Sequence, residues 1–141
     1  MAKHKDKDVK TNAMRILEQK KIPYTVHTYD CEEFMDGISM ADALGQPHEI
    51  VYKTLVTVAK SREHYVFVIP VEAELDLKKA ARAVHEKAVE MLPLKELTEL
   101  TGYVRGGCTC IGMKKQFPVV MDESARKLPK VPVSGGRRGS Q

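Results

Sequence analysis

Residues 50–71 have the sequence IVYKTLVTVAKSREHYVFVIPV, which contains two β-strand patterns separated by a polar tetrad. The first pattern, 50–58, is largely apolar on both of its alternating faces, which predicts a strand inside a sheet. The polar residues 60–63 are typical of a hairpin turn, and 64–71 returns as the partner strand. The sequence therefore predicts an antiparallel hairpin at the centre of the fold.

Helix and strand patterns follow one another on both sides of this hairpin. Thr11 can cap a helix that runs to Lys20. Ser39 can open a second helix that ends at Gly45. The other expected elements are strands at 24–29, 88–91, 117–121 and 131–134, a helix capped by Asp76, a helix from Pro93 to Thr101 and a helical turn at 124–128. This order predicts a single α+β domain with a mixed, largely antiparallel sheet.

Length and composition indicate one globular domain. The chain has 141 residues, of which 43% are hydrophobic and 30% charged. The longest apolar run, 65–71, is far shorter than the ~20 residues that span a bilayer, so no membrane partner is expected. Residues 1–10 lack the apolar core of a secretory signal and are expected to form a disordered leader. We therefore expect a cytoplasmic protein whose cysteines remain reduced.

Basic residues gather towards the C-terminus, although the net charge is only +4. From Lys114 onwards the only acidic residues are Asp122 and Glu123, against seven Lys or Arg side chains. Such a concentration of positive charge is typical of a surface that faces phosphate groups. A solvated, partly frayed tail is the alternative interpretation.

Lys53 lies in the middle of a strand, between Val51 and Leu55, on a face that otherwise has a core pattern. A buried ammonium is costly unless it is paired or lies in a polar pocket, so Lys53 is a candidate to bind an anion. The alternative is an edge strand from which the lysine reaches water.

Two glycine-rich segments are candidate binding loops. Residues 102–112 include Gly106 and Gly107, where backbone N–H groups can converge on a carboxyl, a phosphate or a developing oxyanion. The loop does not match a Walker motif, and a simple turn is the alternative. Residues 134–139 form a second, basic glycine segment, for which a disordered C-terminus is the alternative.

The cysteines and histidines do not predict a metal site or a nucleophilic triad. Cys108 and Cys110 are separated by one residue, whereas zinc ligands are usually separated by two to four and come with a second pair. The five histidines are scattered and form no local Ser-His-Asp or Cys-His arrangement. We therefore expect no metal and no cofactor, and two small buried thiols or a redox-sensitive pair.

Several short motifs between Ala13 and Gly139 occur in the order found in one known family. They include Val51-Tyr-Lys-Thr-Leu, Leu75-Asp-Leu-Lys-Lys-Ala-Ala, Thr101-Gly-Tyr-Val-Arg-Gly-Gly-Cys and Val133-Ser-Gly-Gly-Arg-Arg-Gly. The chain thus resembles the YbaK/EbsC family of prolyl-tRNA synthetase-associated editing domains. The resemblance implies that residues 11–141 form a deacylase domain whose curved sheet is barrel-like and flanked by helices.

The resemblance also implies an activity. The expected enzyme is a trans-editing deacylase that clears Cys-tRNA(Pro), and also Cys-tRNA(Cys), by positioning the substrate thiol to attack its own ester. The expected partners are aminoacyl-tRNA and prolyl-tRNA synthetase, with no DNA. The alternatives are an Ala-tRNA(Pro) deacylase, a non-catalytic regulator that binds tRNA or a synthetase, and a redox- or metal-responsive protein using Cys108 and Cys110.

The resemblance assigns site residues by motif position. It implies that Lys53 and Gly106 are the catalytic positions. Residues in contact with the substrate would be Tyr29, Thr54, Gly107 and Ser134, and those in contact with tRNA phosphates would be Arg137 and Arg138. The chain departs from the family at Cys110, where proline is usual, and at Ala73, where a polar asparagine occurs. Relatives also continue beyond the second glycine segment into a strand and a helix.

Overall fold

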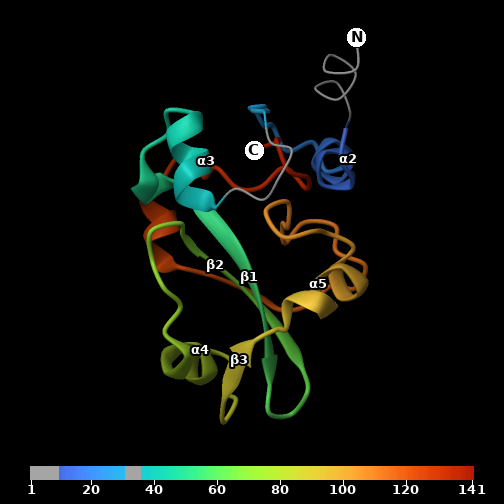
Figure 1. The fold of residues 1–141 in the computed structure, drawn as a ribbon, viewed down its shortest axis with the longest axis vertical. Helices are drawn as coiled ribbons and strands as arrows, with labels where there is room; N and C mark the ends of the chain where they lie inside the picture. The colour runs from blue at the N-terminus through green and yellow to red at the C-terminus, as the bar shows by residue number, and fades with distance from the viewer. Residues whose placement is uncertain (1–9, 31–35) are drawn as a thin grey trace.

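The computed structural model describes residues 10–30 and 36–141, and its four strands form one mixed sheet. The strands are β1 (Tyr52–Ala59), β2 (His64–Pro70), β3 (Val89–Met91) and β4 (Val119–Met121), in the order β3-β1-β2-β4. β1 pairs antiparallel with β2 and β3, and β4 runs parallel to β2. The predicted α+β class is confirmed, although the described sheet is open and not closed into a barrel (Figure 1).

The predicted hairpin is confirmed and forms the centre of the sheet. Its register runs from Tyr52 opposite Pro70 to Val58 opposite His64. The turn between the strands contains Arg62, which adopts a positive φ of 74°. Because β1 lies between β2 and β3, apolar side chains on both of its faces can be buried, as the continuous apolar pattern requires.

The two faces of the hairpin bury different apolar clusters. On one face Ala59 and Phe67 pack with Ala80 and Ala81 of α4 (Leu77–Ala83). On the opposite face Val56 and Val66 pack with Phe117 and with α5 (Leu94–Thr101). A third cluster joins Val51 to α3 (Gly37–Ala43) at the start of β1. The sheet is therefore covered on both faces.

Side-chain caps explain where the helices begin. Thr11 caps α2 (Asn12–Gln19) and Asp76 caps α4, as predicted. The expectation for α3 was wrong, because its cap is Asp36, whose Oδ1 accepts a 2.7 Å hydrogen bond from Ser39 N. Asp36 and Ser39 are both good capping residues three positions apart, and the helix begins at the earlier one.

Two predicted strands are not formed as strands. Residues 24–29 make one isolated bridge, between Thr28 and Ser140, and 131–134 has no strand assignment. The segment 131–134 contains Pro132, which has no N–H, and contributes its carbonyl to Tyr52 N at 2.9 Å. These two strand-like segments therefore form short stretches of backbone pairing and no extended ladder.

The short helical elements complete the described fold. The turns η1 (His48–Ile50) and η2 (Glu123–Lys127) precede β1 and follow β4, and the second agrees with the predicted helical turn. No helix of the described residues is long and apolar enough to cross a membrane. Of the predicted leader, residues 1–10, only Lys10 lies within the described residues.

Candidate active site

Lys53 and Thr54 lie at the start of β1, directly after two buried residues. Both side chains are half-buried, whereas the preceding Val51 and Tyr52 are fully buried. Tyr52 N donates to Pro132 O, so the C-terminal segment, defined here as residues 131–141, runs beside this end of the strand. The Lys53 side chain therefore retains access to solvent, although the two residues before it are fully buried.

Gly106 and Gly107 lie where the backbone of the glycine loop packs closely against the backbone of the C-terminal segment. Gly106 has a φ of +87°, the left-handed region that favours glycine. Gly107 is buried, and a Cβ there would lie 2.7 Å from the carbonyl carbon of Arg137 and 2.8 Å from Arg138 N. The glycine loop, residues 102–112, thus contacts the C-terminal segment directly. Gly107 N donates to Val104 O at 2.9 Å, so that amide closes a turn of the loop.

The second glycine segment is ordered, in contrast to the alternative of a disordered tail. Ser134 Oγ accepts a 3.3 Å hydrogen bond from Gly136 N, and Gly135 N donates to Ser140 O at 2.9 Å. Arg138 Nε donates to Arg105 O of the glycine loop at 2.7 Å. Arg137 and Arg138 are both half-buried. The arginines are thereby held at the junction of the two glycine segments.

Tyr29 also contacts the C-terminal segment. Its side chain packs against the cluster of Met40, Ala41, Val51 and Val71, and its backbone N donates to Gly139 O at 3.0 Å. Next to it, His27 and Gln141 exchange two backbone hydrogen bonds of 3.0 and 2.8 Å. Figure 1 shows the C-terminal segment, in red, crossing from the side of α3 to the side of α2.

The C-terminal segment contacts two of the predicted site residues that lie outside it, Gly107 and Tyr29, and the chain neighbour of a third, Lys53. It bonds to Tyr52 beside Lys53, contacts Gly107 and bonds to Tyr29. Pro132 and Arg137 are close in the chain, so their Cα atoms are at most about 18 Å apart. The C-terminal segment therefore keeps the start of β1 and the glycine loop within a short distance of each other.

A family model described as an aminoacyl-tRNA editing domain matches residues 31–141. The chain belongs to the aminoacyl-tRNA editing domain family. A curated relative from Enterococcus faecalis (strain ATCC 700802 / V583), named "Putative Cys-tRNA(Pro)/Cys-tRNA(Cys) deacylase EbsC", is 49% identical over 142 residues, which covers 100% of this chain and 86% of the relative.

Solved structures agree with this assignment of the editing domain. A crystal structure described as "a putative trans-editing enzyme for prolyl tRNA synthetase" is 26% identical, with a TM-score of 0.78 over 94% of this chain and 85% of the other. A crystal structure of a hypothetical protein, 21% identical, gives a TM-score of 0.82 over 92% of this chain and 85% of the other. The second likeness shows the fold alone.

The two described cysteines of the editing domain, Cys108 and Cys110, are free and half-buried. Within the glycine loop, Cys108 and Cys110 pack against the cluster of Val56, Val66 and Phe117. Burial raises the pKa of Cys108 to about 11 and also raises the pKa of Cys110. Both thiols therefore remain protonated at neutral pH, which makes them poor nucleophiles. In the described parts of the chain, no three His, Cys, Asp or Glu side chains are grouped to hold a metal.

Sequence reasoning missed two residues that hold the two glycine segments of the candidate site. Thr11 was predicted only as a helix cap, yet its Oγ1 also donates to Gly135 O at 2.5 Å. Tyr103 was quoted only as part of a motif, yet its hydroxyl donates to Ile111 O at 2.5 Å within the glycine loop. These contacts join residues that are distant in sequence or that share a loop, and no local pattern indicates them.

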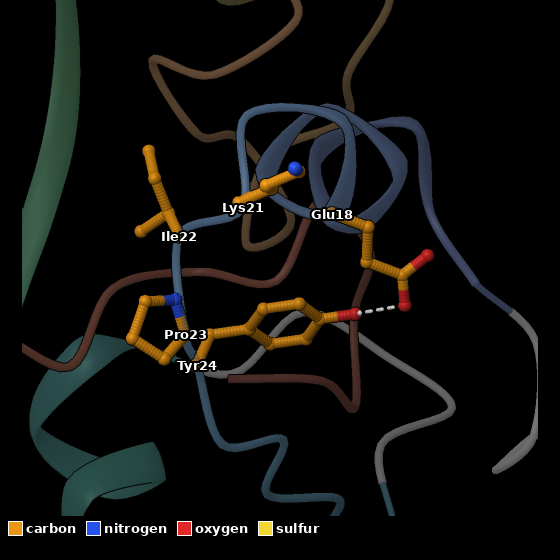
Figure 2. Close-up of a pocket in the computed structure, with 5 residues that line it drawn as sticks. All are labelled: Glu18, Lys21, Ile22, Pro23 and Tyr24. Carbon is orange, nitrogen blue, oxygen red and sulfur yellow. Dashed lines mark hydrogen bonds between the residues drawn. The ribbon is translucent and has the colours of Figure 1, made fainter.

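A separate surface depression lies at the end of α2 and contains none of the predicted site residues (Figure 2). Tyr24 Oη donates to Glu18 Oε1 at 2.9 Å, and Lys10 Nζ lies 2.8 Å from the same oxygen. The hydrogen bond from Lys10, with that from Tyr24, lowers the pKa of Glu18. The depression is formed by one continuous stretch of chain, residues 18–24, and is separate from the candidate site.

Proposed function

We propose that this protein is a trans-editing aminoacyl-tRNA deacylase that clears Cys-tRNA(Pro), and also Cys-tRNA(Cys). The observation that carries the proposal is the 49% identity, over the whole chain, to a relative with that activity in its name. A synthetase pocket for proline cannot strongly reject a side chain of similar size and low polarity, so a separate editing step has a clear purpose. Since its substrate is a charged tRNA, we place the reaction in the cytoplasm.

The proposed reaction uses the nucleophile of the substrate. The thiol sulfur of the cysteinyl group attacks its own ester carbonyl, forming a C–S bond. The ester C–O bond breaks, and the ribose oxygen leaves with the thiol proton. The products are cysteine thiolactone and free tRNA. This route requires no protein thiolate, which agrees with the raised pKa of Cys108 and Cys110.

The site residues would then act by positioning and charge stabilisation. We assign Lys53 to the negative charge that develops on the ester, and Gly106 to a backbone contact with the carbonyl. Tyr29, Thr54 and Ser134 would line the pocket. Gly107 would contribute through its missing side chain, which allows the loop to meet the C-terminal segment. Arg137 and Arg138 would contact phosphates of the acceptor stem.

A deacylation panel tests the function. Purified protein is incubated with Cys-tRNA(Pro), Cys-tRNA(Cys) and Ala-tRNA(Pro), and the remaining ester and the released amino-acid product are measured. We expect loss of the cysteinyl esters, with thiolactone as the first product. Loss of the alanyl ester alone would replace the proposal by an Ala-tRNA(Pro) deacylase. Salt-sensitive tRNA binding without ester loss would indicate a binding protein instead.

The same panel addresses the proposed synthetase partner. Prolyl-tRNA synthetase is added to the reaction with Cys-tRNA(Pro), with a synthetase for another amino acid as control. Docking on the partner predicts faster deacylation only with prolyl-tRNA synthetase. An equal rate with both would show that the deacylase acts on free mischarged tRNA.

A further inference from the structure

Tyr103 lies at the end of α5, where the glycine loop begins. Its side chain and backbone are 7% exposed. The backbone N donates to Thr101 Oγ1 at 3.1 Å, and Thr101, itself 1% exposed, donates from the same oxygen to Leu97 O at 2.8 Å. These bonds fix the main chain of Tyr103 against the last turn of the helix. The side chain of Tyr103 therefore extends from a backbone that is held in place by α5.

The side chain of Tyr103 contacts both glycine segments. Its hydroxyl donates to Ile111 O and would be 3.1 Å from a Cβ placed on Gly112. Its ring carbon Cε1 would be 3.3 Å from a Cβ placed on Gly136. Both glycines have positive φ, of 77° and 97°, so the two backbones turn tightly where they meet the ring. One tyrosine thus spans the glycine loop and the C-terminal segment.

The N-terminal end of α2 also holds the same two segments. Thr11 Oγ1 donates to Gly135 O, and Asn12 Nδ2 donates to Gly112 O at 3.1 Å. Burial of the tyrosine hydroxyl, together with the nearby Cys108, raises the pKa of Tyr103, so the phenol remains a donor at neutral pH. The loop that carries Gly106 is therefore fastened at its far end by Tyr103 and α2.

We propose that Tyr103 is a positioning residue for the editing reaction, which sets the glycine loop relative to the C-terminal segment; this rests on the proposed function. Tyr103 acts through Gly106 and Ser134 and is not placed against the substrate. A backbone donor stabilises developing charge only when it is held in place before the reaction. Loosening the loop therefore lowers kcat more than it changes KM.

The kinetic test compares two phenylalanine variants. Tyr103→Phe keeps the ring between the glycine segments and removes the bond to Ile111 O. Tyr65→Phe is the matched control, because its hydroxyl donates to Glu86 Oε2 at 2.6 Å and its ring packs on the α4 face of the sheet. We expect kcat for Cys-tRNA(Pro) to fall about tenfold in Tyr103→Phe at nearly constant KM, the effect of losing one buried hydrogen bond. The control retains the wild-type kcat.

A second measurement does not depend on activity. Amide hydrogen exchange is followed at residues 106–112 and 134–139 in the folded proteins. We expect exchange there about tenfold faster in Tyr103→Phe, faster also in Asn12→Ala, and unchanged in Tyr65→Phe. Asn12 is exposed, so its replacement leaves the fold intact and loosens the same loop.

The outcomes separate the two proposals. A wild-type protein that deacylates no substrate contradicts the proposed function, whatever the exchange rates are. An active wild type overturns the role of Tyr103 if Tyr103→Phe keeps wild-type exchange in the glycine segments, or if its kcat is unchanged. A rise in KM at constant kcat would also overturn it, because that result assigns Tyr103 to substrate binding.

Discussion

Lys53 is the residue on which the proposed chemistry depends most. It is half-buried in β1, two positions after the fully buried Val51. Lys53→Ala is expected to lower kcat for Cys-tRNA(Pro) by about 10²-fold or more, the scale of removing one electrostatic stabiliser. Lys60→Ala is the matched control, because Lys60 is exposed just beyond the other end of the same strand. A fully active Lys53→Ala protein would remove Lys53 from the mechanism.

Alanine substitutions at Gly107 and Gly45 separate the effect of close packing from the effect of backbone strain. Gly107→Ala places a methyl group against the backbone of Arg137, so we expect a loss of about 1–3 kcal/mol of stability together with loss of deacylation. Gly45→Ala has open space but a φ of +65°, so about 1–2 kcal/mol is lost with activity retained. Urea denaturation and kcat measure the two effects. Normal activity in Gly107→Ala would show that the contact does not matter for the site.

Because the Cys108 thiol is largely buried, we predict that the free energy of unfolding decreases at alkaline pH. The pKa of Cys108 is raised to about 11 in the folded protein and is about 8.5 in an unfolded chain. Between these values the unfolded state loses the proton and the folded state keeps it, so unfolding becomes easier as pH rises. The free energy of unfolding should therefore be fully retained below about pH 8.5 and decline towards pH 11, by at most about 1.4 kcal/mol per pH unit for this group.

Cys108→Ala provides the control for this pH dependence. The difference in free energy of unfolding between wild type and Cys108→Ala is measured from pH 7 to pH 11 by urea denaturation. Other groups titrate in both proteins and cancel in the difference. A difference that stays constant with pH would show that the thiol is not buried in the folded protein.

At the scale of elements, α2 connects helix capping to the C-terminal segment of the candidate site. Thr11 Oγ1 accepts from Met14 N and donates to Gly135 O. Thr11→Val removes both bonds at a residue that is 8% exposed, so a loss of about 1–3 kcal/mol of stability is expected. Thr11→Ser keeps the hydroxyl and should stay near wild type in thermal denaturation. Equal losses in the two variants would assign the effect to the methyl group instead.

The elements also show which parts of the fold can be predicted from sequence. The hairpin and the caps Thr11 and Asp76 were predicted correctly, because strand alternation and capping depend on neighbouring residues. Ser39 was wrong because Asp36, three positions earlier, is an equally good cap. The segments 24–29 and 131–134 have strand-like residues, but a strand requires a ladder of partners. Residues 24–29 form one isolated bridge, and 131–134 gives one bond to Tyr52.

The site shows the same limit. The residues Lys53 and Gly106 could be proposed from their types and from family motifs. The contact of Gly107 with Arg137, and the bond from Thr11 to Gly135, join positions far apart in the sequence. Such contacts depend on how the helices, strands and loops pack together. Patterns among neighbouring residues do not predict them. The sequence therefore predicts candidate groups, and the structure supplies their neighbours.

At the scale of the whole molecule, the basic side chains at the junction predict salt-dependent tRNA binding. Arg137 and Arg138 are held beside the glycine loop. The logarithm of the binding constant for tRNA should fall linearly with the logarithm of salt concentration. Arg137→Ala should reduce that slope by about 1 if the side chain contacts one phosphate. Lys20→Ala, at the exposed end of α2, serves as control and should keep the wild-type slope.

The path of the C-terminal segment has a consequence for the order of folding. The bond between Thr11 and Gly135 spans 124 positions, whereas the hairpin closes within neighbouring residues. Local pairings form early and distant ones late, because a long loop must first be ordered. Refolding from denaturant is therefore expected to build the hairpin first and to place residues 131–141 last. Deacylation should return only with that final step.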